Sequence, residues 1–151
     1  MPTTLAISWD ELDRLVARLA DDVGRDHDVV LAITRGGLVP AGMLAYRLDL
    51  REILVAGAVF YLPDGSRHPR PVIGHFPDAE LLTARRVLVI DEVWESGETM
   101  TEVLARVRAA GGRPVSAVLH YKPDRSRVAG RPDHFAEKVD SWVAYPYKAG
   151  A

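Results

Sequence analysis

The chain has 151 residues, 48% of them hydrophobic, which is enough to bury one sizeable core and too few to divide comfortably into two. The absence of cysteine excludes a disulfide framework, a thiolate metal site and a cysteine nucleophile. The 19 basic and 21 acidic residues leave a net charge of −2 and are spread along the chain, which argues against a broad nucleic-acid-binding surface.

The amino-terminal sequence MPTTLAISWDEL has neither the basic region nor the apolar run of a signal peptide. No stretch approaches the roughly 18 apolar residues of a membrane span. We therefore expect one domain over residues 1–151 that works in the cytoplasm, with no membrane and no nucleic acid as partner.

The first half of the chain alternates helical and strand patterns. Apolar residues recur at helical spacing behind a capping box, which predicts an amphipathic helix over residues 9–22. The short apolar run VVLAIT at 29–34 is typical of a strand that is covered on both faces. The same reasoning predicts a helix over 38–48 and a strand over 52–61.

The segment from about 62 to 77 interrupts this alternation because proline and glycine crowd it, and we expect a long loop there. Long loops in compact domains are often functional covers. Its basic side chains would suit a cover over bound phosphates: Arg67, His68, Arg70 and His75. A solvated hairpin with no role in binding explains the segment equally well.

The alternation resumes with VLVI at 87–90, a buried strand that runs into two carboxylates. A helix is predicted from about 99 to 110, a strand over 114–120 and a last strand near 140–144. Strands that alternate with crossover helices predict an α/β fold, with a mostly parallel twisted sheet and helices on both faces.

Three of the predicted strands end in turns that carry reactive or charged side chains. These turns are Thr34-Arg35-Gly36-Gly37, Asp91-Glu92 and His120-Tyr121-Lys122. In sheets of this kind, ligands bind at the carboxyl ends of the strands. The sequence therefore predicts a binding site where the carboxyl ends of these strands meet.

The stretch VLVIDEVWESGETM joins a strand, an acid pair and a small-residue turn at a helix start. The turn from Ser96 to Thr99 offers free amides, hydroxyls and the positive end of a helix dipole, which favour a phosphate. Asp91 and Glu92 can accept hydrogen bonds from a ribose diol and, with its oxygens, hold Mg2+. Taken alone, the motif also fits an exposed acidic turn followed by an ordinary helix cap.

This stretch resembles the phosphoribosyl pyrophosphate (PRPP) signature of type I phosphoribosyltransferases. The stretch AITRGGLVPAGMLAYRL is similar to the pyrophosphate loop of the bacterial xanthine-guanine and hypoxanthine members. The resemblance implies the type I phosphoribosyltransferase fold with a small C-terminal hood over about 121–147, Mg2+ as cofactor, and a non-proline cis peptide at Thr34-Arg35. It places PRPP on Arg35, Gly36, Gly37, Asp91, Glu92, Glu95, Ser96, Gly97, Glu98 and Thr99.

The resemblance extends to the base. In the xanthine-guanine enzymes, a lysine in the position of Lys122 contacts the purine 6-oxygen, and a tryptophan in a segment similar to DSWV stacks on the ring. It therefore implies that Lys122, Trp142 and Val143 bind the base. An ammonium pairs with a carbonyl oxygen but finds no acceptor in the amino group of adenine, which favours an oxopurine. Considered singly, Trp142 is more often a core residue and Lys122 more often a solvated charge.

The reaction that the resemblance implies is displacement of pyrophosphate from the sugar C1 by a purine nitrogen. Glu95 stands where relatives carry a proposed general base, and Asp91 and Glu92 would serve as ribose and metal ligands; these three are the expected catalytic residues. The chain departs from the family pattern at Glu92 and Glu95, where aspartate is commoner, and at Ser96, where threonine is usual.

The leading hypothesis is thus an enzyme that joins guanine, xanthine or hypoxanthine to PRPP. A PRPP- or nucleotide-sensing regulator of the same fold and a phosphoribosyltransferase for another base, such as a pyrimidine, are the alternatives. Relatives are dimers or tetramers, so we expect a homodimer or homotetramer, with an exposed tail at Tyr145-Pro146-Tyr147 as a possible contact.

Overall fold

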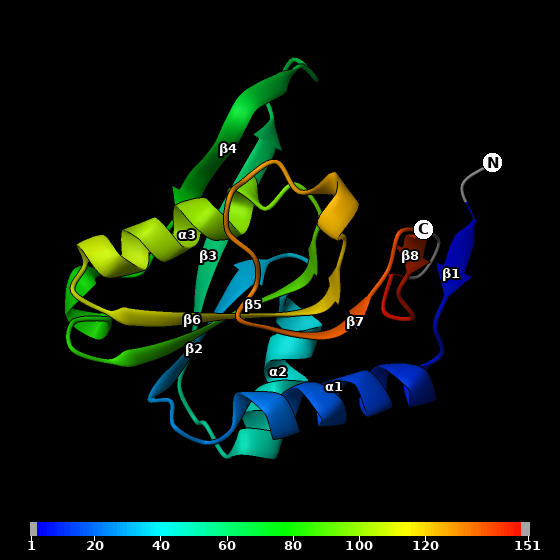
Figure 1. The fold of residues 1–151 in the computed structure, drawn as a ribbon. Coiled ribbons are helices and arrows are strands. Elements are labelled where there is room, and N and C mark those ends of the chain that lie inside the picture. Colours follow the sequence, from blue (N-terminus) through cyan, green and yellow to red (C-terminus); the bar gives the residue numbers. More distant parts are fainter. Residues whose placement is uncertain (1–2, 149–151) are drawn as a thin grey trace.

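A computed structural model describes residues 3–148 of the chain (Figure 1). Its larger sheet has six strands in the order β4-β3-β2-β5-β6-β7, and every pair of neighbours is parallel except β3 and β4. A small parallel pair, β1 and β8, lies beside it. The elements are β1 (Thr4–Ala6), α1 (Trp9–Val23), β2 (Val29–Thr34), α2 (Leu38–Leu48), β3 (Ile53–Tyr61), β4 (Arg67–His75), η1 (Ala79–Leu81), β5 (Arg86–Trp94), α3 (Glu98–Ala109), β6 (Arg113–Tyr121), η2 (Pro123–Arg125), β7 (His134–Lys138) and β8 (Trp142–Ala144).

The helices cover both faces of the larger sheet, as predicted. Helices α1 and α2 pack on one face, where their apolar residues meet Val30 and Ala32 of β2. Helix α3 packs on the other face against Val29, Leu31 and Ile33 of the same strand. All five side chains are at most 2% exposed, which explains why β2 reads as a continuous apolar run.

Helix α1 begins where the sequence predicts. Ser8 Oγ accepts a hydrogen bond from the Glu11 backbone N–H at 3.1 Å, and Glu11 Oε2 accepts one from the Ser8 N–H at 2.7 Å. This capping box satisfies two amides that have no partner inside the helix.

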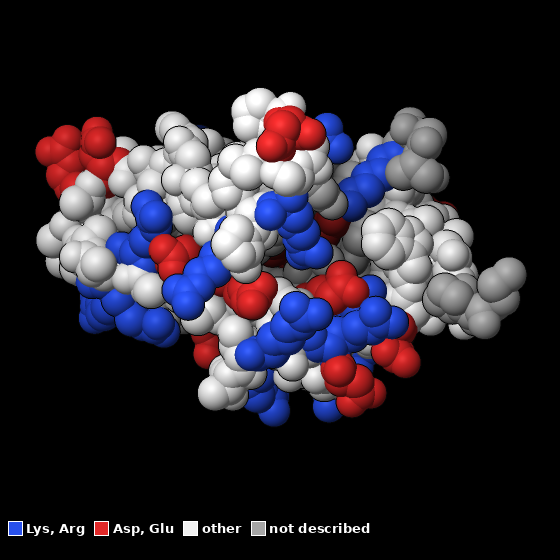
Figure 2. Space-filling model, turned by 90° about the horizontal axis from the view of Figure 1, so that it is seen from above, with Lys and Arg blue, Asp and Glu red and all other residues white. Residues whose placement is uncertain are grey.

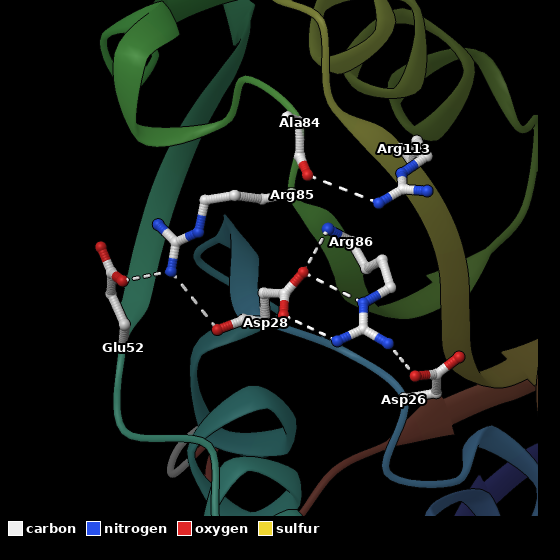
Figure 3. Close-up of polar contacts among 7 residues, drawn as sticks. All are labelled: Asp26, Asp28, Glu52, Ala84, Arg85, Arg86 and Arg113. Carbon is white, nitrogen blue, oxygen red and sulfur yellow. Dashed lines mark hydrogen bonds and ion pairs between the residues drawn. The ribbon is translucent and has the colours of Figure 1, made fainter.

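Ion pairs fasten the amino ends of the central strands (Figure 3). Arg86 of β5 donates from Nη2 to Asp28 Oδ1 at 2.8 Å and also pairs with Asp26, just before β2. Arg85 pairs with Glu52, which precedes β3, at 2.5 Å. These contacts fix the register of β2, β3 and β5 at the edge opposite the predicted site.

The prediction of a long loop over about 62–77 is wrong, because most of this segment is a β-strand. Strand β4 pairs antiparallel with β3, so the segment is mostly one arm of a β-hairpin. Pro69 and Pro71 fit because β4 is the edge strand of the sheet, where a missing N–H leaves no ladder bond unmade.

Two further boundaries differ from the sequence prediction. The predicted strand 87–90 continues to Trp94 as β5, so the acid pair lies inside a strand instead of after it. Strand β7 was not predicted, and it joins the larger sheet beside β6. Among the described residues, none of the helices is both long and apolar enough to cross a membrane.

Candidate functional site

The carboxyl ends of β2, β5 and β6 bring the three predicted turns to one edge of the sheet. The strands are parallel neighbours, with Ala32 beside Ile90 and Trp94 beside Tyr121. Lys122 N donates to Trp94 O at 2.9 Å, which ties the end of β6 to the end of β5. The predicted convergence is therefore confirmed.

In the turn after β2, the backbone lies so close to neighbouring strands that there is little room for side chains. The Thr34-Arg35 peptide bond is cis, as the family resemblance predicted. A Cβ on Gly37 would lie 2.4 Å from Ile90 O and 2.7 Å from Ile33 O, so this position accepts glycine alone. Helix α2 begins at Leu38 and directs its amino end towards this turn, while Arg35 is exposed.

The acid pair is more enclosed than the sequence suggests. Asp91 Oδ1 accepts a hydrogen bond from the Glu92 N–H at 2.7 Å. Glu92 is 8% exposed, and Tyr147 Oη donates to its Oε2 at 2.6 Å while Lys148 Nζ donates to its Oε1 at 2.5 Å. A Cβ on Gly36 would lie 2.6 Å from Glu92 Cδ, so the Glu92 side chain packs directly on the turn after β2.

The expectation of an exposed Tyr145-Pro146-Tyr147 tail is wrong. Tyr145 is 5% exposed, and its hydroxyl donates to Glu92 O at 3.3 Å and lies 2.8 Å from His120 Nδ1. The rings of Tyr145 and Tyr147 stack with centroids 5.4 Å apart. The strand-like alternation of Val143, Tyr145 and Tyr147 was the sequence signal that this segment packs inward.

The turn after β5 leads into α3, which begins at Glu98, one residue before the predicted start. Gly97 has φ +83°, and a Cβ there would lie 2.4 Å from Trp94 Nε1 and 2.6 Å from Val128 Cγ2. Ser96 Oγ accepts a hydrogen bond from the Glu98 N–H at 3.2 Å. The other amides of the first helical turn, including that of Thr99, are available to an anion.

The residues predicted to bind the base come together beside this turn. Lys122 is 4% exposed; its Nζ lies 3.5 Å from Glu95 Oε1 and 5.9 Å from the centre of the Trp142 ring. Trp142 is 62% exposed, so neither a core tryptophan nor a solvated lysine describes these two side chains. A small pocket of about 40 Å³ is lined by Glu92, Val93, Glu95, Lys122, Trp142, Val143, Tyr145 and Lys148.

Sequence reasoning missed Arg125 at the rim of this pocket. Its Nη1 lies 3.9 Å from Glu95 Oε1, and its Nε lies 3.9 Å from Asp140 Oδ1. Arg125 follows Lys122 within the short helix η2, and no motif marks it in the sequence.

Basic residues of the hairpin face the phosphate turn across a second hollow of about 300 Å³. Arg67, His68 and Arg70 of β4 line it together with Glu98 and Arg127, whereas His75 does not. The view from above shows acidic and basic side chains interleaved on this face of the molecule (Figure 2). This mixture suits local binding of a phosphate better than a broad nucleic-acid surface.

Burial sets the ionisation of Asp91. It raises the pKa of Asp91 to about 7; the Glu92 N–H bond opposes the rise, the Glu92 charge adds to it and the Lys148 charge opposes it. Burial and the hydrogen bond to Glu92 also raise the pKa of Tyr147 above its usual range, so its hydroxyl remains a donor.

Comparison with known proteins fits this geometry. The family model of the phosphoribosyl transferase domain matches residues 6–145. The chain belongs to this family. Among curated relatives, the xanthine-guanine phosphoribosyltransferase of Cereibacter sphaeroides is 32% identical over 93% of this chain and 84% of its own length.

Two solved structures extend the family likeness to the fold. The purine phosphoribosyltransferase from Pyrococcus horikoshii Ot3 has a TM-score of 0.80 at 27% identity, covering 98% of this chain and 95% of that one. A hypothetical protein from Neisseria gonorrhoeae with bound ppGpp has a TM-score of 0.84 at 28% identity, covering 99% and 92%. The chain thus has the type I phosphoribosyltransferase fold that its motifs predicted.

The raised pKa of Asp91 predicts a pH-dependent stability in the metal-free protein. A carboxyl whose pKa is higher in the folded state than in the unfolded state stabilises the fold below pH 4, and this stability is lost as the pH rises through 7. Asp91→Asn should be more stable than the wild type by an amount that grows between pH 5 and pH 8, on the order of 2–4 kcal/mol. Urea unfolding of both proteins with a chelator measures this difference; a difference that does not change with pH would contradict the assignment.

Proposed function

We propose that this protein transfers the phosphoribosyl group of PRPP to an oxopurine, either guanine, xanthine or hypoxanthine, and releases pyrophosphate. The observation that carries the proposal is the gathering of Glu95, Lys122 and Trp142, which come from three separate segments, around one pocket beside the phosphate turn. A protein that only bound PRPP would need the phosphate turns but not this group.

The arrangement supports a defined orientation of PRPP. Its 5-phosphate would sit on the amides of Ser96 to Thr99, at the amino end of α3. Its ribose diol would face Asp91, and its diphosphate would lie at the turn of Gly36 and Gly37 with the Arg35 guanidinium beside it. Arg67 and Arg70 of the hairpin line one hollow with Glu98 of the 5-phosphate turn, which supports the hairpin as a cover.

The donor set fits Mg2+ as a cofactor bound together with PRPP. Mg2+ usually takes one or two carboxylates from the protein and fills its other positions with substrate oxygens and water. Asp91 and Glu92 are two such carboxylates, and the described residues contain no larger cluster of metal-ligating side chains. The ion would neutralise charge on the diphosphate as it leaves.

Lys122 supports selection of an oxopurine. Its ammonium is buried at the back of the pocket and has only donors to offer, so it favours a base with a carbonyl oxygen at that point. The exposed face of Trp142 can stack on the ring, and the backbone of Val143 can meet its edge.

Glu95 supports proton removal during transfer. A purine nitrogen would attack the sugar C1, the bond from C1 to the diphosphate oxygen would break, and positive charge would build on the ribose next to the carboxylates. The carboxylate of Glu95 would take the proton that the base loses. Lys122 and Arg125, at 3.5 and 3.9 Å, hold this carboxylate at the pocket.

A regulator that binds a nucleotide without turnover is the second candidate. Two observations favour it: a similar solved structure has ppGpp bound, and the chain's own Tyr147 and Lys148 engage Glu92. Incubation with PRPP, Mg2+ and each of guanine, xanthine, hypoxanthine, adenine and uracil, while pyrophosphate is measured, separates the candidates. The proposal expects release with oxopurines; PRPP binding without release for any base supports the regulator, and release with uracil alone supports a pyrimidine enzyme.

Glu95→Gln removes the proposed base but keeps the size of the side chain. We expect kcat to fall by about 100-fold or more, because general-base catalysis typically contributes that much, with PRPP affinity changed little. Steady-state kinetics and calorimetry of PRPP binding provide the two values. Unchanged turnover would remove Glu95 from the mechanism.

Lys122→Met removes the ammonium but keeps the apolar stem. We expect kcat/KM for the preferred oxopurine to fall by about 10- to 100-fold, as for loss of a charged hydrogen bond, and discrimination against adenine to weaken. Lys138→Met, at an exposed lysine on β7, is the charge-matched control. If base selection is unaltered by Lys122→Met, this residue does not contact the base.

We also propose a homodimer or homotetramer. Tyr46 on α2 is 91% exposed, and Val59 and Val72, paired across β3 and β4, are each 43% exposed. Exposed apolar side chains of this kind favour contact with a second copy. Sedimentation of the wild type and of Tyr46→Glu should give an oligomer that the substitution weakens; a monomeric wild type would contradict this.

A further inference from the structure

The segment Tyr145–Lys148 crosses the proposed PRPP site and occupies one of its two acids. Lys148 Nζ lies 2.5 Å from Glu92 Oε1, and Tyr147 Oη lies 2.6 Å from Oε2, so each carboxylate oxygen has a donor from this segment. Tyr147 Oη also lies 3.5 Å from Gly36 O, in the turn where the diphosphate would bind. The segment therefore links the acid pair to the diphosphate turn.

Packing holds Lys148 in this position. Its backbone N–H donates to Tyr145 O at 3.1 Å, and its Nζ lies 5.5 Å from the centre of the Tyr145 ring. Tyr145 is buried and stacks on Tyr147. The ammonium is presented to Glu92 by an ordered, partly buried turn, with only 36% of the Lys148 side chain exposed.

The contacts with Tyr147 and Lys148 fit the presence of glutamate, instead of the aspartate usual in the family, at position 92. The carboxylate of Glu92 reaches over the turn after β2 because Gly36 has no side chain, and any Cβ there would collide with it. The extra methylene of glutamate, compared with the aspartate usual in the family, lets the carboxylate extend to Tyr147 and Lys148. The glutamate at position 92 is thus matched by the contacts that Tyr147 and Lys148 make with it.

We propose that Lys148 is an internal cation that competes with Mg2+ for Glu92 and so sets the affinity for the complex of Mg2+ and PRPP. The proposal rests on the proposed function, because it assumes that this complex binds at the acid pair. An ammonium and a divalent cation repel each other at one carboxylate, so the ion pair must open before Glu92 can act as a ligand. Tyr147, a neutral donor, orients the carboxylate without adding charge.

Lys148→Met tests this competition because it removes the ammonium and keeps the apolar stem over Tyr145. Calorimetry at pH 8, above the pKa of Asp91, should give tighter binding of Mn2+ alone and of Mg2+ with PRPP, by about three- to tenfold. Lys148→Arg retains a cation and should behave as the wild type. Tyr147→Phe should have a smaller effect than Lys148→Met, and Lys138→Met, which removes an exposed lysine that does not line the pocket, should have none.

The proposal is decided by whether Lys148→Met binds the metal ion and PRPP more tightly or more weakly than the wild type. Unchanged or weaker binding by Lys148→Met, in a protein that melts at the wild-type temperature, would overturn it, since weaker binding would mean that Lys148 contacts PRPP. Equal tightening by Lys138→Met would also overturn it, because the effect would then come from net charge. If one of these outcomes occurs but the wild type releases pyrophosphate with an oxopurine, the competition at Glu92 is rejected and the proposed function stands. If neither the wild type nor any variant binds PRPP, both proposals are rejected.

Discussion

The parallel register of β2, β5 and β6 is the constraint on which the rest of the site depends. It sets three short turns side by side at one edge, although 50 or more residues separate the first from the second along the chain. The ion pairs of Arg85 and Arg86 anchor the opposite edge, where no ligand is expected (Figure 3). Because each turn is glycine-bearing or helix-initiating, fixing the strands also fixes the backbone groups that an anion needs.

Enclosure of the acid pair follows from its place inside β5. A carboxylate removed from water costs free energy unless hydrogen bonds and opposite charge offset the loss. Glu92 obtains both from Tyr147 and Lys148. Among residues 3–148, the Glu92 N–H is the one close donor to Asp91, whose pKa rises. The two neighbours therefore differ in their hydrogen-bond partners and in availability to a ligand, although the sequence presents them as a matched pair.

Local patterns predicted most of the fold: α1, β2 and α2 appear within a residue of their expected bounds, because apolar periodicity and caps determine them. The β-hairpin was predicted only as an alternative to a long loop, because prolines suggest a loop unless the strand is known to be an edge. The site was predicted where motifs are contiguous, as at Gly36 and at Ser96 to Thr99. Tyr147, Lys148 and Arg125 were missed because they reach the site through long-range packing, which a single sequence does not encode locally.

In the proposed mode of binding, Asp91 and the turn from Ser96 to Thr99 hold opposite ends of one sugar phosphate. A crystal structure of the protein with PRPP and Mg2+ would test this arrangement. We expect ribose hydroxyls at the Asp91 carboxylate and the 5-phosphate on the amides at the start of α3. PRPP bound elsewhere, or a phosphate turn that stays free at saturating PRPP, would contradict it.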